Sequence, residues 1–376
     1  MTLLIFIIVL AVLVLAHEWG HFIAARKSGL TVEEFGFGFP PRILAIKKGE
    51  TTYSINLLPL GGFVKILGED GGETSNPKSF ASKSAGIRAL ITVSGVAMNF
   101  LLAVVILIAG FSIGLPQALD DETAAIAKNI QIQVVAVSAG SPAEQAGLSL
   151  GDAIVKAMAP KPPLAAGVPV EGLGTFGETA EIKDISDLQR FVKKYAGKEI
   201  LMEVKRGKRL SEIKITPRVS PPEGDGPLGV ALAKTGIVSY PIYKSVWLGI
   251  KSSFILTWEI TKGFAGLVKN LVIRGEVPQE ISGPVGIAVL TGQAASLGFI
   301  YLLNLVALIS LNLAVLNLAP FPALDGGRLL FLGIEKIKGG KVNPKIENWI
   351  HSAGLALLLL LAILITWRDI LKFKLF

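Results

Sequence analysis

Residues 1–21 read MTLLIFIIVLAVLVLAHEWGH, an apolar run that ends in two histidines and a glutamate. A helix needs roughly 20 apolar residues to cross about 30 Å of hydrocarbon. The run reaches that length only when His17, Glu18 and His21 are counted within the helix. Because an ionisable group inside a membrane helix is costly and marks a functional site, this stretch predicts a membrane span that carries a site.

The composition agrees with a membrane protein. The chain has 376 residues, 51% of them hydrophobic, and a mean hydropathy of +0.58, more apolar than soluble domains. It contains no cysteine, which excludes disulfides and thiolate chemistry. The net charge of +8 comes largely from loops between apolar segments. No basic face interleaved with aromatic residues suggests a nucleic-acid partner.

Four segments are apolar enough to be spans, and they lie at 1–25, 89–115, 298–325 and 349–367. The third lies within the charge-free interval 281–324, and its span is expected from Gly298 to about Leu318. Trp349 and Trp367 bracket the fourth and suit the two headgroup belts. A cleaved signal peptide is the alternative for 1–25, but no Lys or Arg precedes Arg26, which disfavours it.

Lysine and arginine cluster between the first two spans, in 26–88, and between the last two. The positive-inside rule therefore places these loops in the cytoplasm. Both termini and the long segment from about 117 to 280 are expected on the outer side of the membrane. That long segment is exempt from the rule, so its own lysines do not oppose export.

The cytoplasmic loop 26–88 contains β-structure. ILAIKK and TTYSINLL flank the turn Lys48-Gly49-Glu50, which predicts a membrane-associated hairpin. Two interpretations stay open. The segment is an ordinary loop with some strand, or it offers an apolar strand edge with which an extended peptide could pair.

The outer segment carries a second domain, placed at 127–220. IQVVAVSAGSPAEQAGLSLGDAIVKAM, a Pro- and Gly-rich stretch and DISDLQRFVKKYAGKEILMEVKRGKRLSEIKITP predict strand, short helix, strand, loop, helix and two strands. This order, with AGLSLGD at its turn, resembles a circularly permuted bacterial PDZ domain. GDGPLGV at 224–230 adds a strand or a peptide-binding loop. A plug or spacer is the alternative role.

Residues 239–273 predict an amphipathic helix. Its four lysines fall within about 20° of one another around a helix of 3.6 residues per turn. They are Lys244, Lys251, Lys262 and Lys269, and they form one stripe along the helix. Such a helix lies on the outer membrane surface. A helix packed on a neighbouring domain is the alternative.

HEWGH is the HExxH arrangement of zinc hydrolases, because residues four apart share one helix face. His17 and His21 would bind Zn²⁺ through neutral imidazole, and a catalytic zinc takes a third protein ligand. Glu18 fits the general base and acid that activates a water and then protonates the leaving amine. The third ligand is Asp325, modestly favoured on chemical grounds, or His351, since both lie near the cytoplasmic side.

HEWGH in the first span, SGVAMNF in the second, LNLAPFPALDGGR at the end of the third and the intervening PDZ-like domain resemble the bacterial site-2 protease family of intramembrane zinc metalloproteases. The resemblance implies that Asp325 is the third zinc ligand, that Glu18 is catalytic and that the Asn317 amide stabilises the oxyanion. Gly95 and Asn99 match the family's second-span motif, whereas Val96 stands where its proline would be.

The expected fold is therefore an α-helical polytopic membrane protein with four transmembrane helices, a cytoplasmic-side β-hairpin segment and an extracytoplasmic α+β PDZ domain. By resemblance, it would reside in the bacterial inner membrane. It would cleave single-span proteins after a first ectodomain cut, such as anti-sigma factors or remnant signal peptides. A PDZ-containing scaffold or chaperone without proteolysis is the alternative. A metal transporter is disfavoured because the sequence offers a single metal position.

Overall fold

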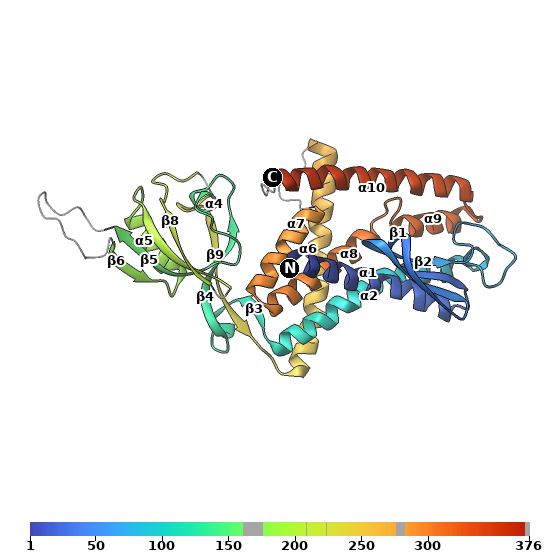
Figure 1. The fold of residues 1–376 in the computed structure, drawn as a ribbon, viewed down its shortest axis with the longest axis horizontal. Helices are drawn as coiled ribbons and strands as arrows, with labels where there is room; N and C mark the ends of the chain where they lie inside the picture. Colours follow the sequence, from blue (N-terminus) through green and yellow to red (C-terminus); the bar gives the residue numbers. More distant parts are fainter. Residues whose placement is uncertain (161–175, 208, 223, 276–282, 373–376) are drawn as a thin grey trace, which may run out of the picture. The chain divides into compact units, whose positions relative to one another are not determined.

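The computed structural model describes all residues except 161–175, 208, 223, 276–282 and 373–376 (Figure 1). The chain forms two compact units. The first comprises Met1–Ala109, Ile242–Ala295 and Leu302–Phe376, and the second comprises Gly110–Pro241 and Ser296–Tyr301. The first unit contains every residue singled out above as a candidate for zinc or catalysis.

Four helices in the described part of the chain are long and apolar enough to cross a membrane. They are α1 (Thr2–Lys27), α2 (Ala85–Ile113), α8 (Phe299–Leu318) and α10 (Pro344–Lys372). Each coincides with one of the four predicted segments, so the expectation of four spans is confirmed at this level.

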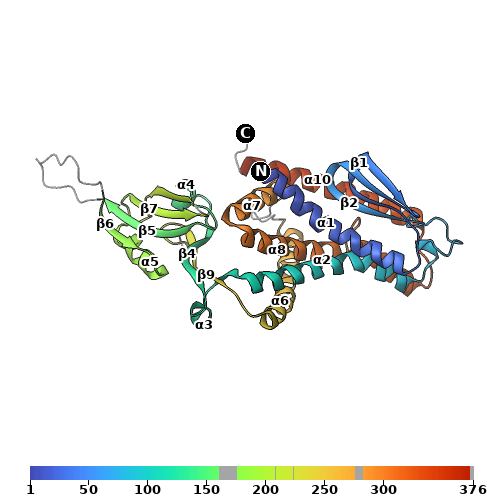
Figure 2. The ribbon, with the colours of Figure 1, turned by 60° about the horizontal axis from the view of Figure 1, so that its bottom comes forward.

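Helices α1, α2 and α8 pack on one another in the first unit (Figure 2). Val9 and Leu13 of α1 form a buried cluster with Val306 of α8. At Gly20, a Cβ would overlap the backbone of Ser94, so α1 and α2 approach to backbone contact there. This close approach brings the HEWGH turn directly against α2.

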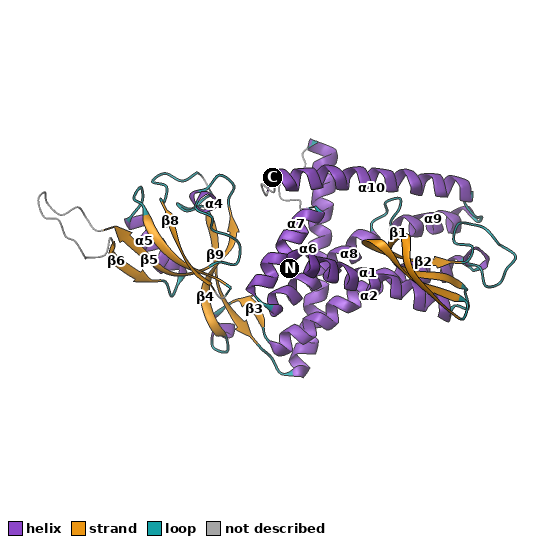
Figure 3. Cartoon of the chain, viewed as in Figure 1, coloured by secondary structure: helices purple, strands orange, loops and turns teal. Residues whose placement is uncertain are grey.

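A long hairpin follows α1, formed by β1 (Val32–Lys48) and β2 (Thr51–Ile66), shown as strands in Figure 3. Its turn lies at residues 49–50, which confirms the predicted hairpin, and Gly49 has the positive φ of +65° that the turn requires. Residues 32–37 pair on one side with 62–66 and on the other with 52–55. Among the described strands, 62–66 therefore has a partner on one side only.

The third predicted span differs from the structure at its end. Helix α8 stops at Leu318, and Asp325 begins a separate helix, α9 (Asp325–Lys338). Pro320 and Pro322 interrupt the helical hydrogen bonding between them. Gly326 and Gly327 are needed because a Cβ on either would overlap the backbone of the turn at 318–322. A further helix, α7 (Pro284–Leu297), precedes α8 and was not anticipated.

Helix α6 (Ile242–Arg274) is continuous over the segment predicted to be amphipathic. One face packs on α2, where the backbone at Gly249 touches Ile108 and the rings of Phe254 and Phe100 lie 5.1 Å apart. Trp247 and Trp258 remain 65% and 63% exposed. One face of α6 thus packs on a neighbouring helix, and the face that carries Trp247 and Trp258 stays uncovered.

The second unit is built on a seven-stranded sheet of order β3-β9-β4-β5-β7-β8, with β6 paired to β5. Its elements are β3 (Leu115–Ala118), α3 (Asp121–Ala124), β4 (Lys128–Val137), α4 (Pro142–Gln145), β5 (Ala153–Pro160), β6 (Phe176–Glu181), α5 (Ile185–Lys194), β7 (Ile200–Arg206), β8 (Arg209–Ile215) and β9 (Val230–Val238). The sheet includes β3 and β9 and so reaches beyond 127–220. GDGPLGV leads into β9, whereas most of the Pro- and Gly-rich stretch at 160–177 lies outside the described residues.

Candidate metal centre

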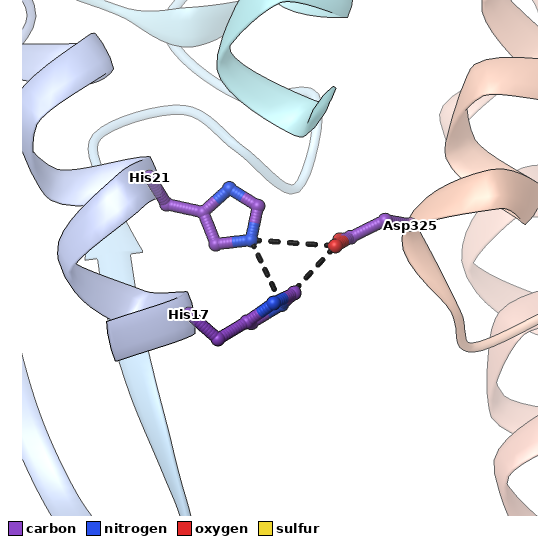
Figure 4. A group of neighbouring side chains, drawn as sticks. All are labelled: His17, His21 and Asp325. Carbon is purple, nitrogen blue, oxygen red and sulfur yellow. Dashed lines mark hydrogen bonds and ion pairs between the residues drawn. The ribbon is translucent and has the colours of Figure 1, made fainter. Parts of the chain in front are cut away.

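His17, His21 and Asp325 converge on one point, as Figure 4 shows. The two histidines lie one turn apart on α1, and Asp325 is the first residue of α9. His17 Nε2 lies 3.2 Å from His21 Nε2. Asp325 Oδ2 lies 3.2 Å from His17 Nε2 and 3.4 Å from His21 Nε2. Of the two third-ligand candidates left by the sequence, the fold brings Asp325 to the histidines.

The triangle has the dimensions of a tetrahedral zinc site. With ligand atoms about 2.0–2.1 Å from Zn²⁺, tetrahedral geometry separates two ligands by roughly 3.3–3.4 Å. Asp325 Oδ2 is buried and has no hydrogen-bond partner among the described residues. Its nearest polar neighbours are the two imidazole nitrogens, so a cation bound between the three atoms would neutralise this buried carboxylate. These three residues therefore fit zinc.

A backbone carbonyl of α2 fixes the protonation of His21. His21 Nδ1 lies 2.9 Å from the carbonyl oxygen of Ile91. A carbonyl can only accept, so Nδ1 carries a proton, and Nε2 of the neutral ring is the nitrogen that remains to bind a metal. This is the arrangement that orients a metal-binding imidazole. No residue type or spacing predicts that Ile91 would provide the acceptor.

Helix α2 also supports both rings sterically. A Cβ at Gly95 would lie 2.7 Å from Cε1 of His21 and 2.8 Å from Cε1 of His17. Asn99, fully buried one turn further along, has its side-chain amide 3.5 Å from His17 Nδ1. The helix runs without interruption through Val96. The missing family proline thus leaves α2 continuous beside the histidines.

The centre opens on a cavity of about 600 Å³. Glu18 and Asn317, predicted to be catalytic, both line it together with the triangle. The strand segment 62–66 of β2 forms another wall. Gly62 permits this approach, because a Cβ there would lie 3.1 Å from Cγ of Glu18. The three candidate metal ligands, the Glu18 carboxylate, the Asn317 amide and residues 62–66 thus surround one cavity.

Two further residues of the cavity, Arg328 and Glu69, were not assigned a role from the sequence alone. Arg328, three residues after Asp325, forms an ion pair with Glu69. Glu69 also accepts a hydrogen bond of 3.3 Å from the backbone N–H of Ile66. The end of β2 is thereby tied to the helix that begins with Asp325. His351 lines the cavity as well, but it contacts the backbone of Ala323 and lies outside the converging group.

Comparison with known proteins gives a consistent result. The profile of peptidase family M50 matches residues 5–361. The chain is 30% identical over 454 residues to zinc metalloprotease RasP of Shouchella clausii, covering 99% of each chain. It is 29% identical over 453 residues to zinc metalloprotease RasP of Oceanobacillus iheyensis, and 28% identical over 449 residues to regulator of sigma-W protease RasP of Bacillus subtilis. In both cases 98% of each chain is covered.

The apolar helices, the HExxH turn and the converging carboxylate define a zinc-dependent intramembrane protease of the site-2 type. The chain belongs to peptidase family M50. The predicted protease activity and the predicted zinc cofactor are thereby confirmed, and the chain is a bacterial membrane protein.

Proposed function

We propose that this protease hydrolyses peptide bonds within or near the transmembrane segment of single-span membrane proteins. His17, His21 and Asp325 hold the Zn²⁺, and Glu18 is the general base and acid. The observation that carries the proposal is the triangle of 3.2, 3.2 and 3.4 Å beside Glu18 in one cavity.

Bound Zn²⁺ would acidify a water and polarise the scissile carbonyl. The Glu18 carboxylate accepts a proton from the attacking water and then returns it to the departing amide nitrogen. The Asn317 side-chain N–H donates to the carbonyl oxygen as that oxygen gains negative charge. The Ile91 carbonyl keeps the His21 ring in place throughout, through the bond of 2.9 Å at Nδ1.

The substrate must be unwound before it can react, because a membrane helix already satisfies its own backbone hydrogen bonds. Residues 62–66 favour capture of the unwound segment. They line the cavity, and among the described strands they are paired with β1 alone. An extended substrate that adds to this free edge regains backbone hydrogen bonds lost on unwinding.

Selection of substrates is assigned to the extracytoplasmic part. The domain resembling a PDZ domain, together with α6 and its exposed Trp247 and Trp258 at the outer surface, acts as a size filter that admits substrates after a first ectodomain cut. Both termini share that side. The name of the Bacillus subtilis relative, regulator of sigma-W protease, supports anti-sigma factors as one substrate class. Remnant signal peptides have the same single-span chemistry.

The deciding experiment compares wild type with Glu18→Gln in nanodiscs, using a single-span reporter with a short ectodomain and a measurement of bound zinc. We expect zinc in both proteins and cleavage by wild type only. Glu122→Gln, an exposed carboxylate of α3, is the matched control and should cut normally. Cleavage by Glu18→Gln at the wild-type rate would remove Glu18 from the mechanism.

The size filter has a separate test. The second unit's sheet runs from β3 to β9, so residues 115–238 are replaced as a whole by a short polar linker. The shortened protein should cut intact substrates with long ectodomains as well as pre-trimmed ones. If it still cuts pre-trimmed substrates and rejects long ones, selection does not reside in this domain.

A further inference from the structure

Helix α10 reaches the metal centre with a side chain that is not among the converging ligands. His351 Nδ1 accepts a hydrogen bond of 2.8 Å from the backbone N–H of Ala323. Ala323 belongs to the turn between α8 and α9 and precedes Asp325 by two residues. One contact therefore joins α10 to the short segment that delivers the third ligand candidate.

The turn needs outside support at this residue. Ala323 has a φ of +76°, in the left-handed region that a residue with a Cβ disfavours. Such conformations persist where the surroundings impose them. The backbone hydrogen bonds of the turn are donated by Ala319, Phe321 and Leu324, whereas the Ala323 N–H donates to His351. His351 thus satisfies a backbone donor and holds a disfavoured conformation at once.

A second contact from α10 lies one turn further along the same face. At Gly354, a Cβ would lie 2.7 Å from the carbonyl oxygen of Pro322 and 2.8 Å from its carbonyl carbon. The backbone of α10 therefore packs directly on the residue before Ala323. The ring of Phe331 of α9 lies 5.5 Å from the His351 ring. The turn is held between α9 and α10.

The two nitrogens of His351 have different roles. Since Nδ1 accepts, it carries a lone pair, and Nε2 carries the proton of the neutral ring. Nε2 is buried and makes no hydrogen bond to the described residues, and Glu347 Oε1 lies 4.0 Å away. The contact that His351 makes toward the centre is consequently the one through Nδ1.

We propose that His351 is a positioning residue that sets Asp325 through the turn at 319–324, so that the zinc affinity of the site depends on α10. The inference rests on the proposed role of Asp325 as a ligand. Helix α10 is otherwise mostly exposed, because only 6% of its most apolar stretch is buried within the chain. A helix that faces lipid is thereby linked to the position of a metal ligand.

The test is zinc affinity, measured by competition with a chelator on the full chain in nanodiscs. His351→Asn keeps an acceptor near the Nδ1 position, whereas His351→Gln moves its amide toward the Nε2 position and His351→Leu has none. We expect His351→Asn to bind zinc within about threefold of wild type, and the other two to bind roughly 10–100-fold more weakly, as for lost supporting contacts of metal ligands. Excess zinc should restore kcat in His351→Leu.

Two results would overturn the proposal: wild-type zinc affinity in His351→Leu, or equal weakening in His351→Asn and His351→Gln. If the leucine variant does not fold, the Asn and Gln pair still decides the question. Asp325→Asn is measured in parallel. Wild-type affinity in that variant would refute the ligand assignment itself, whereas weak binding there with normal binding in His351→Leu would refute only the role of His351.

Discussion

The Nδ1 atom of His21 and the carbonyl oxygen of Ile91 lie 2.9 Å apart. A backbone group of the second span therefore keeps a proton on Nδ1 of a histidine in the first span. The same span touches both rings at Gly95 and approaches His17 with Asn99. Helix α2 is thus the support of the two histidines, as the turn before α9 is the support of Asp325. Substitutions in these supports separate their contribution from that of the ligands.

Replacing Gly95 by alanine should displace the histidine rings, because the new Cβ would lie within 2.8 Å of Cε1 in each ring. We expect loss of stoichiometric zinc and of cleavage in a protein that still inserts in the membrane. Gly86→Ala is the matched control in the same helix, since nothing lies within 4 Å of a Cβ there. That variant should keep its zinc, and Gly95→Ala with full zinc content would contradict the packing described.

We expect Asn99 to support zinc binding through its side-chain oxygen. For His17 to bind metal through Nε2, its Nδ1 must carry a proton and needs an acceptor. Asn99 Oδ1 is buried without a hydrogen-bond partner among the described residues, and its amide lies 3.5 Å from Nδ1. Turning the amide brings Oδ1 to that proton.

Asn99→Asp should therefore keep or strengthen zinc binding, and Asn99→Leu should weaken it by about tenfold, in the range for supporting residues of a metal site. Chelator competition distinguishes the two variants. Equal affinities in both would show that Asn99 contributes packing alone.

Much of the fold follows from local composition. A membrane span requires a long uncharged stretch of residues, so the hydropathy of the sequence is enough to predict the four segments. The hairpin around Gly49 follows from its turn residue and flanking strands. The HExxH motif can be recognised in the sequence because residues four apart lie on the same face of a helix. The sequence alone does not end α8 at Leu318, since the contacts that demand Gly326 and Gly327 exist only once the turn has folded back.

The site was predictable only in part for the same reason. Spacing pairs His17 with His21, but the choice of Asp325 over His351 rested on resemblance, because both residues suit the cytoplasmic side. The contacts of Ile91 and Ala323 use backbone groups, which every residue has, so no residue type signals them. The ion pair of Arg328 with Glu69 joins distant parts of the chain and has no local pattern.

We expect the stability of the fold to depend on the buried ion pair of Arg88 with Glu335 as a unit. The two side chains are 11% and 8% exposed, and Glu335 also accepts a bond of 3.2 Å from the Val342 N–H. Removing one partner strands a buried charge, so Arg88→Met should cost about 3–5 kcal/mol of stability. The double variant Arg88→Met with Glu335→Met should recover most of this.

Reversible denaturant unfolding of wild type, Arg88→Met, Glu335→Met and the double variant in mixed micelles gives the coupling free energy. Lys336→Met, an exposed neighbour of Glu335, is the control and should change stability by less than about 0.5 kcal/mol. Additive losses in the double variant would mean that the two charges act independently.

Asp369 should anchor the start of α7. Its carboxylate is 1% exposed and accepts hydrogen bonds of 2.9 Å from the Gly283 N–H and 2.7 Å from the Gly286 N–H. These are donors that the first turn of a helix leaves without partners, and a negative charge there is favoured. Asp369→Ala should therefore cost about 1–3 kcal/mol and speed hydrogen exchange at these two amides.

Asp369→Asn keeps an oxygen acceptor without the charge, so its effect should fall between wild type and Asp369→Ala. Ile363→Ala, at a position 66% exposed on the same helix, is the control and should leave exchange at 283–286 unchanged. Hydrogen exchange followed by mass spectrometry resolves the segment. Unchanged exchange in Asp369→Ala would mean that α7 begins at Pro284 through its own packing, with α10 contributing nothing to that end.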